Sequence, residues 1–106
     1  MSKNLLNNLM KQAQQMQERV KKVQEEAGSK TVDASSGGGM VTVVANGRQE
    51  VLSIKIDRSV VDTNDIEMLQ DLIAAAVNEA LRKSRELMKD EMGRITAGMG
   101  LPPGLL

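Results

Sequence analysis

The residues with the clearest potential for chemistry are three consecutive glycines, Gly37, Gly38 and Gly39. Glycine-rich loops cradle phosphate groups when a Gly-Lys-Ser/Thr sequence follows and opens a helix. Here the glycines lead into a β-branched segment, and no lysine comes directly after them. The sequence therefore predicts a turn or bulge between two strands at this position, and not a nucleotide site.

Two pairs of neighbouring acids are the next candidates, because carboxylates can act as general acid and base or bind a metal ion. Asp62 and Asp65 lie in a polar connector, and Asp90 and Glu91 lie near the end of a helical segment. Neither pair has a second ligand cluster or a base of another type nearby in the sequence. Helix capping and a solvated helix face explain these acids better, so we expect no catalytic residues and no metal ligands.

The composition argues against several classes of function. The chain contains no Cys and no His, which removes thiolate chemistry, disulfides and imidazole ligands. It also contains no Phe, Trp or Tyr, so the bases of a single-stranded nucleic acid would find no aromatic ring to stack on. We expect a protein that is not an enzyme and that uses no cofactor and no small-molecule substrate.

Two long helices are expected to carry the charged side chains. Over residues 2–27 the apolar positions alternate in spacings of three and four, which is a heptad seam and predicts a helix about 40 Å long. The seam consists of Leu6, Leu9, Ala13, Met16, Val20, Val23 and Ala27. Ser2 can cap the start of this helix, and Gly28 can end it. A second helix with a wider apolar stripe is expected over about residues 65–92, with Gly93 as its end.

Between the helices the sequence predicts a three-stranded antiparallel meander. The expected strands cover residues 30–35, 40–45 and 49–56, where β-branched residues are frequent. The pair Asn46-Gly47 is preferred at the centre of a two-residue type I′ hairpin. Because Leu52, Ile54 and Ile56 fall on one face of the last strand, we expect one face of the sheet to be buried.

The order of helix, three strands and helix places the chain in the α+β class. Its 106 residues make a single domain, residues 1–106, in which about residues 93–106 are expected to form a flexible apolar tail rich in Gly and Pro. An aromatic-free core and a narrow helical seam indicate that a second subunit completes the fold, so we expect a homodimer. No apolar run approaches the ~20 residues that cross a bilayer, and no signal-peptide stretch is present, so we expect no membrane contact and a cytoplasmic location.

The charges leave two interpretations open. The formal net charge is zero, so the overall charge of the chain does not indicate a nucleic-acid partner. Basic residues are nevertheless frequent on both helices. In the second helix, Glu79–Lys83 and Arg82–Glu86 stand four residues apart and can serve as plain helix support. The alternative to such a solvated, ion-paired face is a surface that contacts DNA phosphates in a dimer.

Four segments together resemble the YbaB/EbfC family of bacterial nucleoid-associated proteins, in one order and over nearly the whole chain. These segments are LMKQAQQMQ at 9–17, SSGGGMVTVVANGRQEVLSIKID at 35–57, AAAVNEALRKSRELMKDEM at 74–92 and TAGMGLPPGLL at 96–106. The resemblance implies a tweezer-like homodimer of α-β-β-β-α protomers, with helices that project from a shared body. It also implies binding to double-stranded DNA, a place in the nucleoid, and roles in nucleoid organisation and gene regulation.

The family implies that the helices bind DNA, and charge and position select the residues. We expect mainly phosphate contacts that depend strongly on salt. The candidates are Lys3, Lys11, Arg19 and Lys22 on the first helix and Arg82, Lys83, Arg85 and Lys89 on the second. The alternative function is a protein-interaction module that uses the heptad helix and the apolar tail, with weak or incidental DNA binding. A small salt dependence of DNA binding would favour that alternative.

Overall fold

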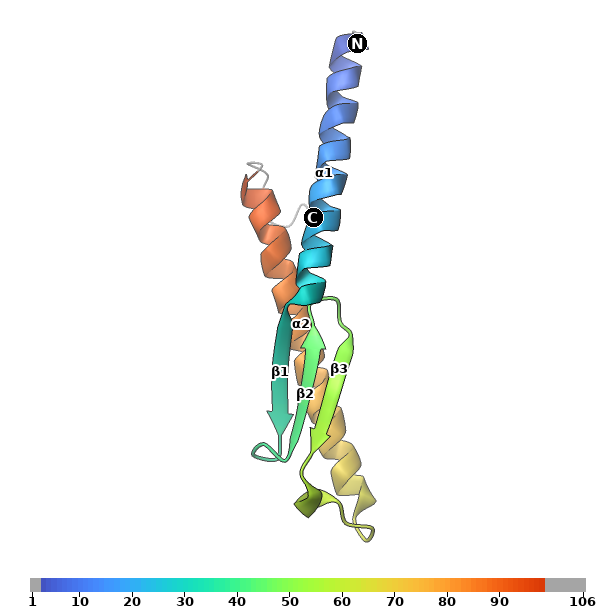
Figure 1. Cartoon of the computed structure of the whole chain (residues 1–106), viewed down its shortest axis with the longest axis vertical. Coiled ribbons are helices and arrows are strands. Elements are labelled where there is room, and N and C mark those ends of the chain that lie inside the picture. The colour runs from blue at the N-terminus through green and yellow to red at the C-terminus, as the bar shows by residue number, and fades with distance from the viewer. Residues whose placement is uncertain (1–2, 99–106) are drawn as a thin grey trace.

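Two long helices and a three-stranded sheet make up the protein in a computed structural model, which describes residues 3–98 (Figure 1). The elements follow in the order α1 (Lys3–Ser29), β1 (Thr31–Ser36), β2 (Val41–Asn46), β3 (Val51–Ile56), the short 3-10 helix η1 (Arg58–Val60) and α2 (Ile66–Gly98). The molecule is long and narrow, with principal extents of 73 × 20 × 18 Å. The predicted α-β-β-β-α order is confirmed.

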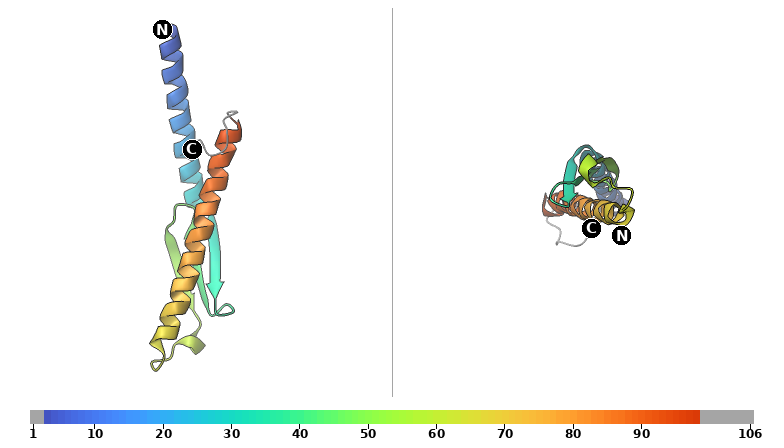
Figure 2. Two further views of the ribbon diagram at one scale, coloured as in Figure 1. Left: turned by 180° about the vertical axis from the view of Figure 1, so that it is seen from behind. Right: turned by 90° about the horizontal axis from the view of Figure 1, so that it is seen from below.

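The core lies between the sheet and α2. The strands form an antiparallel meander in the order β1-β2-β3, and α2 crosses one face of it, mainly over β1 and β2 (Figures 1 and 2). The buried side chains that meet there are Ala34, Val41, Val43 and Ala45 from the sheet and Ala76 and Ala80 from α2. Because alanine is small, α2 can approach the sheet closely while the valines of β2 fill the centre.

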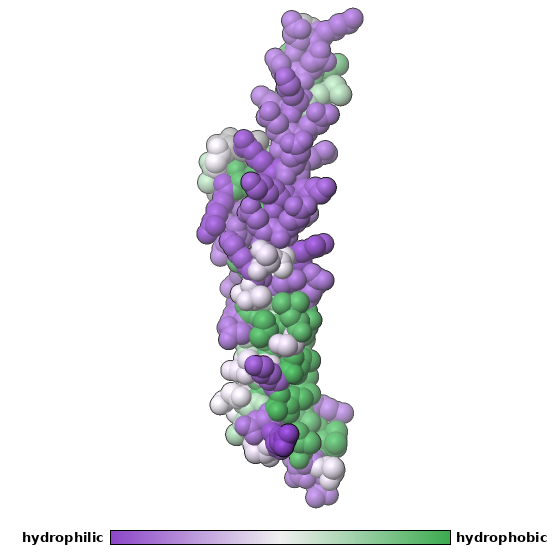
Figure 3. Space-filling view, in the orientation of Figure 1, coloured by the Kyte–Doolittle hydropathy of each residue, from purple (hydrophilic) through white to green (hydrophobic). Residues whose placement is uncertain are grey.

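The expected burial of β3 is wrong within the protomer. Leu52 is 56% exposed, Ile54 is 45% exposed and Ile56 is 38% exposed. A helix with its side chains is about 10 Å wide and strands are about 4.8 Å apart, so one helix covers about two strands. Figure 3 shows a hydrophobic surface over the sheet, whereas α1 is largely hydrophilic on the visible face.

The turn between β1 and β2 is the triple glycine, as expected. Gly37, Gly38 and Gly39 have φ angles of 60°, 66° and 95°, a backbone region that residues other than glycine rarely adopt. The N–H of Gly39 donates to the carbonyl of Ser36 at 3.2 Å. These glycines reverse the chain, so their role in the fold is accounted for without a phosphate.

The hairpin between β2 and β3 is not the predicted two-residue type I′ turn. Four residues, 47–50, join the two strands, and the left-handed position belongs to Gln49, which has a φ of 63° and whose N–H donates to the carbonyl of Asn46 at 3.2 Å. Gly47 has no positive φ. Its N–H donates to the carbonyl of Ala27 at 2.9 Å, and a Cβ at Gly47 would stand 2.6 Å from that oxygen. Close packing against the end of α1 is therefore what requires glycine there.

Both helices extend beyond the glycines that were expected to end them. α1 continues through Gly28 to Ser29, and the N–H of Gly47 in the β2–β3 hairpin donates to the carbonyl of Ala27 near its end. α2 continues through Gly93 to Gly98, because the burial of Ile95 outweighs the low helix propensity of glycine, about 1 kcal/mol. The expected start of the tail at about residue 93 is thus wrong.

The expected capping by Ser2 and the rest of the tail, residues 99–106, lie outside the described residues. Neither helix of the part that the structure describes has an apolar stretch that would span a bilayer.

Candidate nucleic-acid interface

α1 projects from the body of the protomer, and we call it the arm (Figure 1). The C-terminal half of its seam lies beside the C-terminal half of α2, where Ala27 is fully buried and Met16, Val20 and Val23 are partly buried. The N-terminal half extends past the end of α2 (Figure 2). There Leu6, Leu9 and Met10 are 49%, 45% and 56% exposed. Among residues 3–98, the heptad seam therefore packs against α2 near the base of the arm and is largely exposed toward its tip.

The face of the arm opposite the seam carries unpaired cations. Lys11 and Lys22 stand eleven residues apart, which is close to three helical turns, so they share this face about 16 Å apart. Lys3 and Arg19 flank them, and all four side chains are exposed. Within residues 3–98 no hydrogen bond or ion pair involves the charged group of any of the four. Their charges are available to a partner from solution.

The charge of Arg82 on α2 is already matched by two glutamates. Its guanidinium bonds Glu79 through Nε at 3.0 Å and Nη2 at 2.5 Å, and it bonds Glu86 through Nη1 at 2.5 Å. The hydrogen bond from Arg82 holds the pKa of Glu79 below its ordinary value. The predicted Arg82–Glu86 pair is confirmed, and this part of α2 is an ion-paired face.

Lys83 ties α2 to the sheet. Its Nζ donates to the backbone carbonyl of Asp33 in β1 at 2.8 Å, and the residue is partly buried. The predicted pairing of Lys83 with Glu79 is not formed, because Glu79 is occupied by Arg82 and the sheet carbonyl lies within reach of the lysine. Sequence spacing along one helix could not show a contact fifty residues away.

Arg85 and Lys89 are exposed and unpaired within the described part of the chain. They lie four residues apart on the face of α2 that points away from the core. The seam of the arm faces α2, and the buried face of α2 faces the arm and the sheet. The two groups of free cations therefore face away from each other, and one protomer does not bring all eight candidates onto one surface.

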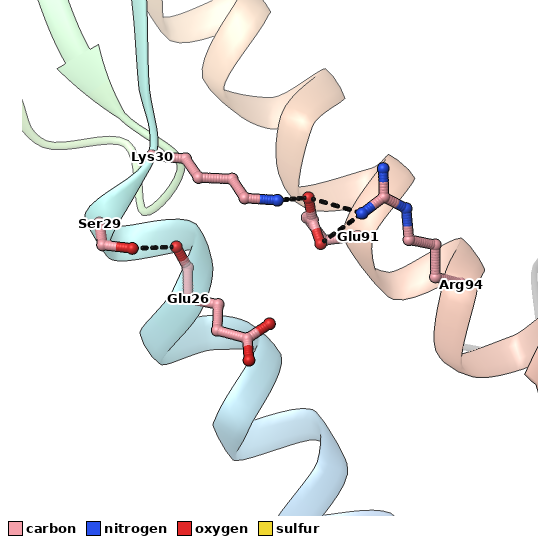
Figure 4. A network of polar contacts seen from close by, with 5 residues as sticks. All are labelled: Glu26, Ser29, Lys30, Glu91 and Arg94. Atoms are coloured by element: carbon pink, nitrogen blue, oxygen red, sulfur yellow. Dashed lines mark hydrogen bonds and ion pairs between the residues drawn. The ribbon is translucent and has the colours of Figure 1, made fainter.

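The junction between the arm and α2 holds a buried carboxylate that sequence reasoning missed (Figure 4). The side chain of Glu91 is 5% exposed, accepts a hydrogen bond from Nζ of Lys30, and has Nη1 of Arg94 3.5 Å from each of its oxygens. The bond from Lys30 is the main cause that holds the pKa of Glu91 below its ordinary value.

The expectation of a solvated face at Glu91 is wrong, because the base of the arm closes over it. A signal was present in the sequence: Glu91 is seven residues after Ser84 and four before Ile95, both of which are buried on the same stripe of α2. Within the described chain no group of acids is arranged to hold a metal ion.

The fold is a small sheet backed by one helix, and a second helix extends from it as a cationic arm. These features define a class of small binding proteins whose surface suits a polyanion. Comparison with known proteins identifies the family within that class. The chain belongs to the YbaB/EbfC DNA-binding family, whose model matches residues 2–99. The predicted family is thereby confirmed.

Named relatives and one solved structure agree with this assignment. A nucleoid-associated protein of Syntrophobacter fumaroxidans is 59% identical over 102 residues, which cover 92% of this chain and 93% of that protein. A nucleoid-associated protein of Acetivibrio thermocellus is 59% identical over 100 residues, covering 94% and 88%. The crystal structure of an uncharacterized protein from Helicobacter pylori has the same fold, with a TM-score of 0.73 and 26% identity over 90% of this chain and 97% of that one.

Proposed function

We propose that the protein binds double-stranded DNA as a homodimer and takes part in nucleoid organisation and gene regulation. The observation that carries the proposal is the outer face of the arm, where Lys11 and Lys22 are exposed and unpaired within residues 3–98. This face belongs to a chain of a DNA-binding family, and relatives named nucleoid-associated proteins support the nucleoid as its location.

The binding mechanism is electrostatic. Each lysine or arginine that neutralises a phosphate releases condensed counterions, so affinity falls steeply as salt rises. A rigid helix holds its cations at a fixed spacing, which positions the protein on the duplex without reading the bases. The free cations on both helices are therefore expected to bind many sequences.

The uncovered side of β3 supports the homodimer. Exposed apolar side chains occur on β3, on the connector that follows it and at the start of α2, and they include Leu52, Ile54, Ile56, Val61, Ile66 and Met68. Apolar surface of this kind on a soluble protein marks an interaction site. β3 is also an edge strand with a free side. A second copy with the same patch would cover it by two-fold symmetry.

The test is a titration of the protein into a fluorescently labelled duplex of about 30 base pairs at several salt concentrations, followed by anisotropy. The variant Lys11→Glu with Lys22→Glu is expected to bind at least about tenfold more weakly, with a salt slope lower by about two per protomer. The matched control is Lys55→Glu with Arg58→Glu, which changes the net charge equally at the opposite end of the molecule. Light scattering and circular dichroism check assembly and folding of both.

Two results would contradict the proposal. An equal loss of affinity in both double variants would attribute binding to net charge and not to the arm. Unchanged affinity in the Lys11/Lys22 variant would reject the outer face of the arm as a contact surface.

A second candidate function is docking to a protein, favoured by the exposed apolar side chains of Leu6, Leu9 and Met10 at the tip of the arm. It requires DNA binding that is weak even at low salt and nearly independent of salt. The same titration therefore separates the two candidates.

A further inference from the structure

Besides the packing of its seam on α2, the arm is held by two polar contacts near its C-terminal end. α1 is about 40 Å long, so a tilt of about 10° at its base would move its tip by about 7 Å. The first contact is between backbones: the N–H of Gly47 donates to the carbonyl of Ala27 at 2.9 Å and is 3.2 Å from the carbonyl of Lys30. The second is the contact of Lys30 with Glu91.

α2 holds both contacts from one face. The hydroxyl of Ser84, which is fully buried, donates to the carbonyl of Asn46 at 2.6 Å and accepts the N–H of Gln49 at 2.9 Å. Ser84 thus anchors the hairpin that bonds the end of the arm. Glu91 lies seven residues later, two turns along the same face, and reaches the residue that directly follows α1 (Figure 4). Ser84 therefore acts on the arm through the hairpin, whereas Glu91 directly contacts Lys30 at the end of the arm.

The contact made by Glu91 resists movement of the arm. Its carboxylate is 5% exposed, whereas the side chains of Lys30 and Arg94 are 44% and 73% exposed. A buried charge that loses its partner is strongly unfavourable as long as it stays buried. A shift of the arm that separated Lys30 from Glu91 while the carboxylate stayed covered would leave it, among the described residues, only Arg94 at 3.5 Å. The Lys30–Glu91 contact therefore favours one arm direction over others.

We propose that Glu91 is a positioning residue that fixes the direction of the arm and, through it, the contacts of Lys11 and Lys22 with DNA. The part that concerns DNA rests on the proposed function, whereas the part that concerns the arm does not.

The direction of the arm can be measured by electron paramagnetic resonance. The chain has no cysteine, so Asn7→Cys and Asn78→Cys, both at exposed positions, give two specific spin-label sites on the arm and on α2. Dilution with excess unlabelled protein isolates the distance within one protomer. A narrow distribution is expected for the parent, and a broader or shifted one for Glu91→Gln and for Lys30→Gln. The control is Asp90→Asn, which removes the same charge from the adjacent, exposed position.

DNA binding is then compared between the Glu91→Gln and Asp90→Asn variants without labels. Their net charges are equal, so a difference reports the position of the arm. Glu91→Gln is expected to bind about three- to tenfold more weakly than Asp90→Asn, with a salt slope lower by about one. Circular dichroism should show equal helix content. A purely structural role would lower the melting temperature without changing the salt slope.

Two outcomes would overturn the proposal or its link to DNA. Unchanged distance distributions in both Glu91→Gln and Lys30→Gln would overturn the positioning role. If Glu91→Gln does not fold, the distance distribution of Lys30→Gln tests the positioning role, because that variant keeps Glu91 paired with Arg94. A displaced arm with unchanged affinity and salt slope would overturn the link to DNA. Failure of the proposed function would differ, because the parent protein itself would then show no salt-dependent binding while the distances still changed.

Discussion

At the scale of single residues, the surroundings of a cation matter more than its place on a helix. Arg82 and Lys22 are both exposed and both occur among basic residues. The charge of Arg82 is shared between Glu79 and Glu86, whereas Lys22 has no ion pair within residues 3–98. A phosphate would have to compete with two carboxylates for Arg82, so Lys22 is the better phosphate ligand.

We therefore predict that Arg82→Gln weakens binding to a duplex less than Lys22→Gln does, although both remove one positive charge. The free energy of unfolding should change by less than about 1 kcal/mol in Arg82→Gln, because exposed ion pairs contribute little. Anisotropy titrations and urea unfolding measure the two quantities. A larger loss of affinity in Arg82→Gln would show that DNA displaces the glutamates.

At the scale of elements, two glycines in or beside helices have opposite roles. Gly47 packs against the end of α1, and a Cβ there would be 2.6 Å from the carbonyl oxygen of Ala27. Gly93 lies inside α2, is exposed, and would place a Cβ in open space. The first glycine serves a contact between elements, while the second weakens the helix that contains it.

Alanine substitution should separate these roles. Gly47→Ala is expected to destabilise the fold by about 2 kcal/mol, since the backbone must move to relieve the clash. Gly93→Ala is expected to stabilise it by about 1 kcal/mol through higher helix propensity. Chemical unfolding gives both values. A stable Gly47→Ala variant would mean that the hairpin can move off the end of α1 at little cost.

At the scale of the whole molecule, the sheet is only partly covered by its own chain. We predict that Ile54→Asp, at the centre of the exposed side of β3, converts the proposed dimer to a monomer, because a carboxylate would be buried without a partner. Light scattering at micromolar concentration measures the mass. Leu9→Asp is the matched control, since Leu9 is equally exposed at 45% but lies at the tip of the arm. A dimer that survives Ile54→Asp would place the interface elsewhere.

Local patterns of the chain were sufficient to predict the element order, the three strands to within one or two residues, the glycine turn and the family. Each of these depends on neighbours in sequence. Periodicities of 3.6 and 2.0 residues identify helices and strands, and consecutive glycines between two strand segments indicate a turn. The motifs that carry the family resemblance are likewise read along the chain.

Only the tertiary structure decided where both helices end, which turn joins β2 to β3, which cations are free, and that Glu91 is buried. Gly47 packs on Ala27, Lys83 bonds the carbonyl of Asp33, and Lys30 reaches a carboxylate sixty-one residues away. The uncovered side of β3 likewise follows from the path that α2 takes across the sheet. Each feature depends on residues that are distant in sequence and meet only after folding, so no local pattern could determine it.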